Sequence, residues 1–153
     1  MSYGAFAALL GLEFSEVNHE AGTVRSWQAT AAGDCCLVQV RKNAVVDTFP
    51  FADSSAFNNR PDLLASLPAF NGSQNDLVKM FVGSWDCDDT FFLMTDALAC
   101  WFFKEREAGN EPWNLLRDLD TQEQDSFQKF VSDSRLSAAM KNDDVTLVRI
   151  SIG

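Results

Sequence analysis

The stretch FFLMTDALACWFF, residues 91–103, decides how we expect this chain to fold. The run TFFLM, residues 90–94, is apolar and has the length of a buried strand, whereas ALACWFFKERE, which begins at Ala97, has the composition of a helix. One carboxylate, Asp96, lies between them. The sequence therefore predicts a buried strand that passes directly into a helix, with an acid at the junction.

Two interpretations of Asp96 follow from that position. As a helix N-cap, its carboxylate would accept hydrogen bonds from free backbone N–H groups. As a ligand on a rigid strand end, the same carboxylate would suit a hard cation such as Mg²⁺ or Mn²⁺. The residues around Asp96 leave both interpretations open.

Upstream of this stretch, the sequence predicts a meander of antiparallel strands. An alternating strand is expected near residues 24–30, a turn at Gly33–Asp34 and a β-rich strand over residues 36–41, with the next turn at residues 42–43. Residues 4–14, by contrast, are small and apolar, and we expect a helix end there that runs into a strand.

The middle of the chain is predicted to be irregular. Residues 49–76 are rich in Pro, Asn, Ser and Gly, which favours a long connection with one helical turn at residues 62–66. Because long ordered loops are often functional, this segment is a candidate flap. The apolar runs at residues 77–85 and 90–94 then form a predicted hairpin with both strands largely buried.

Two further helices and a last strand complete the prediction. Helices are expected over residues 112–118, with Pro112 in the first turn, and over residues 121–135. The segment NDDVTLVRISIG, residues 142–153, predicts a turn followed by a β-branched strand. We therefore expect one α+β domain over residues 1–153, with mainly antiparallel sheets and packed helices. The predicted core includes Trp27, Phe91, Phe92, Leu93, Leu98, Trp101, Leu147 and Ile150.

The charge balance disfavours phosphate polyanions as partners. The chain has 22 Asp and Glu against 12 Lys and Arg, a formal net charge of -10. Nucleic acids and anionic membrane surfaces recruit clustered basic residues, so neither is expected to bind. No run approaches the roughly 18 apolar residues that a membrane span needs, and the N-terminus lacks the basic region of a signal peptide.

The cysteines and the histidine do not predict a zinc site or a disulfide framework. Cys35, Cys36, Cys87 and Cys100 form no CxxC pair, and His19 is the only histidine. We expect reduced cysteines in a cytoplasmic protein. A Cys-His nucleophilic mechanism through His19 is disfavoured because no triad is evident.

Acids at turns beside buried strands recur at three places. Asp34 lies in AAGDCCLVQV, Asp96 in FFLMTDALACWF, and the pair Asp143 and Asp144 in KNDDVTLVRI. Turns select Asp on their own, so each acid taken singly has a purely structural interpretation. Carboxylates held on strand ends also suit Mg²⁺ or Mn²⁺.

In their order and strand context, these motifs resemble the C-terminal half of the type 2C metal-dependent protein phosphatases, and bacterial members in particular. The family patterns are Gly-Asp-Ser, Ser/Thr-Asp-Gly/Ala and Asp-Asn/Asp-x-Thr, and the resemblance runs from about residue 4 to residue 152. It implies that Asp96 and Asp143 bind the catalytic metal ions and that Asp34 belongs to an additional, weaker metal site. Asp144 and Thr146 are secondary candidates.

The resemblance implies part of a four-layer αββα sandwich and a hydrolase that removes phosphate from phosphoserine or phosphothreonine proteins. Family members use two or more Mg²⁺ or Mn²⁺ ions to activate a water, so no Ser or Cys nucleophile is assigned. This chain departs from the pattern because it contains no Asp-Gly dipeptide, the family's metal-bridging motif. We therefore expect the N-terminal metal-binding half to be lacking and fewer ions to bind.

Three interpretations stay open on the sequence. The chain is a truncated or incomplete phosphatase whose exposed sheet favours self-association or a partner chain. Alternatively, it is a catalytically inactive relative that binds phosphoproteins or metal. In the third, it is an unrelated acidic α+β domain with ordinary turn aspartates.

Overall fold

The computed structural model describes residues 6–57, 63–65, 77–119 and 124–153. Within these ranges the chain has an α+β fold with three antiparallel sheets and three α-helices, which confirms the predicted α+β class with mainly antiparallel sheets. None of the helices in these ranges is long and apolar enough to cross a membrane.

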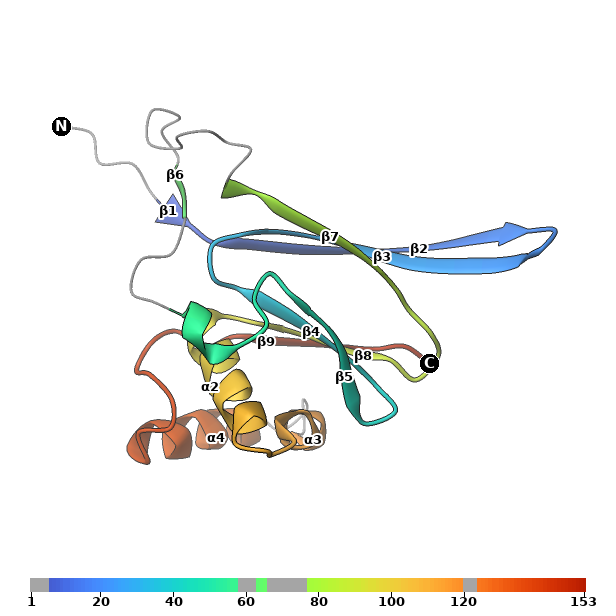
Figure 1. Ribbon diagram of the computed structural model, residues 1–153. Coiled ribbons are helices and arrows are strands. Elements are labelled where there is room, and N and C mark those ends of the chain that lie inside the picture. Colours follow the sequence, from blue (N-terminus) through green and yellow to red (C-terminus); the bar gives the residue numbers. More distant parts are fainter. Residues whose placement is uncertain (1–5, 58–62, 66–76, 120–123) are drawn as a thin grey trace.

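The first sheet has three strands in the order β2-β3-β7. Strands β2 (Leu9–His19) and β3 (Gly22–Ala32) pair along their whole length, whereas β7 (Lys79–Ser84) pairs only with residues 26–31 of β3. The far ends of β2 and β3 therefore continue past β7 as a two-stranded ribbon (Figure 1).

The second sheet has four strands in the order β5-β4-β8-β9. Its strands are β4 (Cys36–Arg41), β5 (Ala44–Phe49), β8 (Thr90–Met94) and β9 (Leu147–Ser151). The predicted turn between β4 and β5 is confirmed, since Lys42 and Asn43 have φ values of 48° and 60°. Such left-handed residues match the twist of a tight hairpin.

Small elements and helices complete the fold. Strands β1 (Phe6–Ala7) and β6 (Leu64–Ala65) form a two-stranded sheet, and η1 (Ser54–Ala56) is a 3-10 turn. The helices are α2 (Asp96–Glu107), α3 (Pro112–Asp118) and α4 (Gln124–Leu136). Figure 1 shows the three-stranded sheet over one face of the four-stranded sheet, with the helices on the other face.

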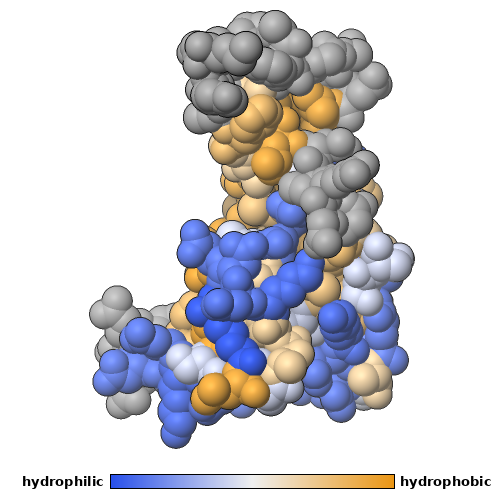
Figure 2. All heavy atoms as spheres, turned by 90° about the vertical axis from the view of Figure 1, so that its left-hand side faces the viewer, coloured by the Kyte–Doolittle hydropathy of each residue, from blue (hydrophilic) through white to orange (hydrophobic). Residues whose placement is uncertain are grey.

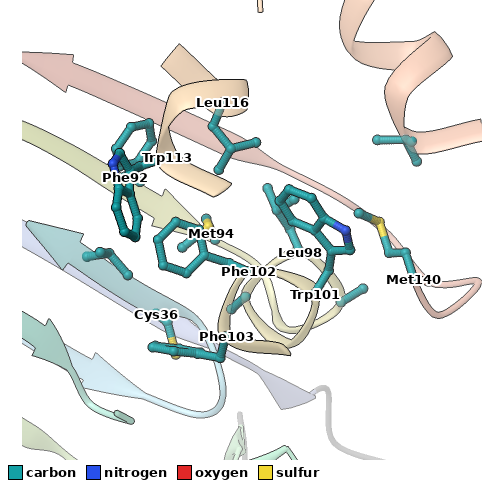
Figure 3. Packing of buried hydrophobic residues seen from close by; sticks show 14 of the residues in the cluster. Cys36, Phe92, Met94, Leu98, Trp101, Phe102, Phe103, Trp113, Leu116 and Met140 are labelled. Carbon is teal, nitrogen blue, oxygen red and sulfur yellow. The ribbon is translucent and has the colours of Figure 1, made fainter. Parts of the chain in front are cut away.

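The central strands β4 and β8 of the four-stranded sheet are buried on both faces, which explains why they are largely apolar. Between the two sheets lie Trp27, Ala29, Ala31, Leu37, Phe49 and Phe91. Against the helices, Phe92 and Met94 of β8 pack on Leu98, Trp101 and Phe102 of α2 (Figure 3). The predicted core is confirmed, with Leu93, Leu147 and Ile150 partly buried at its margins.

A buried polar network crosses the inter-sheet core. The Asp89 carboxylate, fully shielded from solvent, accepts hydrogen bonds from Arg41 Nε at 2.7 Å and from Gln39 Nε2 at 2.7 Å. The same carboxylate accepts a second bond from Arg41 and one from the backbone N–H of Asp86. Gln39 in turn accepts a bond from Trp27 Nε1 at 2.9 Å. The network therefore joins β3, β4 and the turn before β8.

Three local predictions are wrong. Residues 6–7 and 9–14 are strand, not a helix end, because their alanines and leucines pair with β6 and β3. Strands β7 and β8 do not form a hairpin, since β7 pairs with β3 in the other sheet and is largely exposed. Of the helical turn expected at residues 62–66, residues 64–65 form strand β6 and residue 63 has no regular structure, while residues 62 and 66 lie outside the described ranges.

The outer face of the three-stranded sheet is partly apolar. Strand alternation places Phe81 of β7 toward Trp27, so Met80 and Val82 face outward, where they are 62% and 63% exposed. In Figure 2, hydrophobic residues gather in the upper part of the molecule above a hydrophilic middle.

Candidate metal centre

The predicted acidic sites lie at one end of the two sheets. Figure 1 shows the β3–β4 turn, the β8–α2 junction and the segment that leads into β9 at this same end. Asp34 lies in the first of these segments, Asp96 in the second and Asp143 in the third. Segments that are far apart in the sequence thus carry these acids at the same end of the fold.

Hydrogen bonds of Thr95 join the β8–α2 junction to the segment before β9. Its hydroxyl accepts a hydrogen bond from the Thr146 N–H at 2.9 Å and donates one to the Asp144 carbonyl at 3.1 Å. Its own N–H donates to the Thr146 carbonyl at 3.2 Å. Thr95 is also the N-cap residue of α2, so Asp96 is the first helical residue and the N-cap interpretation of Asp96 is wrong.

Gly33 sets the position of Asp34. Its φ is +96°, in the region that favours glycine, and a Cβ there would lie 2.7 Å from the Ala8 Cβ. Only glycine fits this turn without moving β4 or the chain before β2. The turn therefore holds the half-buried Asp34 at this end of the sheets.

Unbalanced negative charge accumulates around Asp34. Burial raises the pKa of its carboxyl above the ordinary value, and the charges of Asp96 and Asp143 raise it further, while Lys141 partly opposes them. The charges of Asp96 and Asp143 therefore reach the Asp34 carboxyl. A bound cation would relieve their repulsion, so the charge arrangement favours a cation at this end of the fold.

A small cavity of about 160 Å³ adjoins the acids, lined by Leu10, Cys35, Leu93, Met94, Thr95, Thr146 and Val148. Burial raises the pKa of the Cys35 thiol, and the charges of Asp34 and Asp96 add to this effect. Cys35 is therefore a neutral thiol at neutral pH. The four cysteines are all free.

The acids do not form a complete metal cage. Among the residues that the structure describes, no three His, Cys, Asp or Glu side chains stand close enough to hold an ion together. Mg²⁺ is commonly held by only one or two carboxylates and retains several waters, so the oxygen chemistry of this set still fits such an ion. The two secondary metal-site candidates lie in different places. Thr146 lines the small cavity, whereas Asp144 lines a different cleft beside α4.

Two contributors to this region were not predicted. Thr95 was given no role of its own, although Thr directly before a helical pattern is a typical N-cap signal. Lys141, the cation that partly offsets the acids, lies in KNDD, where it reads as an ordinary turn residue.

We expect Asp34→Asn to stabilise the metal-free protein. Because the pKa of Asp34 is raised in the folded chain, the ionised carboxylate lowers the free energy of unfolding at neutral pH. That penalty disappears as the pH falls through the raised pKa. Removing the charge should therefore raise the Tm at pH 7 by about 1–3 °C. At pH 4.5 the increase in Tm should be smaller.

Calorimetry with chelator at pH 7 and at pH 4.5 measures this change. Asp133→Asn, which neutralises an exposed acid on α4, is the matched control and should leave the Tm within about 1 °C. A lower Tm for Asp34→Asn at pH 7 would show that Asp34 has a stabilising role instead.

A comparison of this chain with protein-family models, curated proteins and solved structures finds no match. The functional assignment therefore depends on the residues and their arrangement.

Proposed function

We propose that this chain is part of a type 2C-like, metal-dependent protein serine/threonine phosphatase, with its cation-binding surface at Asp34, Asp96 and Asp143. The observation that supports the proposal is that the segments carrying these three acids lie at one end of the sheets, where the charges of Asp96 and Asp143 raise the pKa of Asp34. The substrate would be a phosphoserine or phosphothreonine protein. A divalent ion, when bound, supplies a water of lowered pKa and offsets phosphate charge.

The residues of this chain would position that ion. Asp34 is oriented by the Gly33 turn, and Asp96 is set by the α2 N-terminus, whose dipole also favours a carboxylate. Asp143 directly precedes the segment that hydrogen bonds join to Thr95. Mg²⁺ or Mn²⁺ is the fitting ion because the ligands are hard oxygens.

The architecture supports the same proposal. A helical layer and two sheets would be three layers of an αββα sandwich. The fourth layer would lie on the outer face of the three-stranded sheet, where Met80 and Val82 are exposed. A second copy or a partner chain would supply it.

A catalytically inactive phosphoprotein- or metal-binding module is the second candidate. It is favoured by the absence of an Asp-Gly dipeptide from the chain and of a three-ligand group from the described residues. Hydrolysis of a small aryl phosphate with Mn²⁺, abolished by chelator, would distinguish an enzyme from a binding module.

We expect Mn²⁺ to bind the wild-type chain and to bind Asp96→Asn or Asp143→Asn about 10- to 100-fold more weakly, because each variant loses an anionic oxygen ligand. Isothermal titration calorimetry measures these affinities. Asp133→Asn provides the control, since it removes the same charge from an exposed site on α4. Absence of Mn²⁺ binding, or equal affinity in all variants, would refute the proposed metal site.

A further inference from the structure

A second cleft lies beside α4, next to the candidate metal centre. Its volume is about 370 Å³, and it is lined by Phe127, Gln128, Val131, Arg135, Asp144 and Val145. Four of these residues belong to α4, and the other two directly follow Asp143 in the chain. Figure 1 shows how the chain passes from α4 to β9 at the end of the sheets that carries the acids.

Among the described residues that line this cleft, Arg135 is the one cationic side chain. Its Nη2 donates a hydrogen bond to the Asp143 carbonyl, which holds the guanidinium beside the candidate metal ligand. Arg25 and Arg41 form ion pairs with carboxylates, but Arg135 forms none among the described residues, and its buried Nε has no partner there. Arg135 therefore keeps a charge that an anionic ligand can neutralise.

The geometry of a guanidinium favours phosphate as that ligand, because its fork of N–H donors matches phosphate oxygens. The carboxylates of Asp143 and Asp144 would repel a phosphate dianion from the metal-free site. A divalent cation on the neighbouring acids would offset this repulsion. Phosphate binding at Arg135 should therefore strengthen when the metal is bound.

The rest of the cleft provides an apolar wall. Val131 is buried, and Phe127 and Val145 pack against the main helical core. A wall supported in this way can receive an apolar side chain without rearranging. A peptide with an apolar residue beside its phosphorylated residue would contact both Arg135 and this wall.

We propose that the α4 cleft binds the phosphomonoester group of a phosphorylated peptide, with Arg135 on the phosphate and Phe127, Val131 and Val145 against a flanking apolar side chain. This inference rests on the proposed function, because it assigns the place where the substrate of the metal centre is held. Arg135 is a substrate-binding residue in this account.

The test is titration calorimetry with Mn²⁺, inorganic phosphate and a phosphoserine peptide that has a leucine next to the phosphoserine. Wild type, Arg135→Gln and Arg135→Lys are compared, and Lys129→Gln is the control, since Lys129 is an exposed cation on α4 outside the cleft. Thermal unfolding of each variant confirms that it is folded.

We expect the Mn²⁺-loaded chain to bind the phosphopeptide more tightly than inorganic phosphate. Arg135→Gln should weaken phosphopeptide binding about tenfold or more, with Mn²⁺ affinity within about twofold of wild type. Arg135→Lys should recover part of the loss, and Lys129→Gln should change nothing. Equal binding by Arg135→Gln and wild type, or no phosphopeptide binding by the Mn²⁺-loaded chain, would overturn the inference.

The two proposals fail in different ways. If the chain binds no Mn²⁺, the proposed metal centre is refuted. The peptide titration without metal then tests whether the α4 cleft binds the phosphopeptide. Peptide binding that Arg135→Gln abolishes would then support the peptide-binding cleft without the metal centre. Absence of peptide binding would refute both proposals. If phosphate binds as tightly as the peptide, the apolar wall does not contact the ligand.

Discussion

Replacing Asp89 by alanine is expected to lower the free energy of unfolding by about 3–5 kcal/mol. The Asp89 carboxylate accepts four hydrogen bonds from Arg41, Gln39 and the Asp86 backbone while it is fully buried. Its removal would leave the Arg41 charge and the Gln39 amide without their partner in the core, which costs more than the bonds themselves contribute. Urea unfolding followed by tryptophan fluorescence measures the loss.

Asp86→Ala is the control for this change, because Asp86 is an exposed acid whose Oδ1 lies 3.7 Å from Arg25 Nη1. Loss of this surface ion pair should lower the free energy of unfolding by less than about 1 kcal/mol. Similar losses in the two variants would show that the network does not stabilise the fold. Burial alone would raise the pKa of Asp89, but the hydrogen bonds, led by those of Arg41, hold it below the ordinary value of 3.8. The contribution of Asp89 is therefore present at neutral pH and is lost as the pH falls through that lowered pKa.

Gly83→Ala is expected to cost about 2–3 kcal/mol through overpacking. A Cβ at position 83 would lie 2.5 Å from the Cε2 and Cζ2 atoms of Trp27. The indole cannot move away easily, because it is 1% exposed and its N–H is bonded to Gln39. Either the ring or strand β7 must shift, and both changes disturb the packing between the two sheets.

Gly11→Ala in the same sheet is the matched control for this substitution. A Cβ at Gly11 would meet only the Thr30 carbonyl oxygen, at 3.9 Å, and its backbone does not need glycine. Its free energy of unfolding should change by less than about 1 kcal/mol. If the two alanine variants have the same free energy of unfolding in urea, Trp27 does not restrict the size of the side chain at position 83.

Local patterns in the sequence were sufficient to predict most elements. Strand β4 and helix α3 have the predicted bounds, because clear turn signals and Pro112 delimit them. Strand partners were harder to predict, since an apolar run does not reveal which strand it will pair with. For that reason β7 was assigned to a hairpin with β8, although it belongs to the other sheet.

The sequence placed the candidate acids in the correct turns but could not show their environment. The charges of Asp96 and Asp143 act on the Asp34 carboxyl, whereas Asp144 lines the α4 cleft. Asp89 was missed because it is one of the acids in DCDD, which reads as a surface turn. A signal was present in β4, where Gln39 and Arg41 interrupt an apolar strand on one face and thereby require a buried polar partner.

The two-stranded ribbon beyond β7 has a practical consequence. Its tip, around residues 19–22, is exposed, and it lies at the opposite end of the molecule from the acids (Figure 1). Exposed hairpin tips tolerate inserted peptides well. An epitope or a fluorophore-binding tag placed between Glu20 and Ala21 would thus give a handle for immobilising the protein while the acidic end remains open to solution.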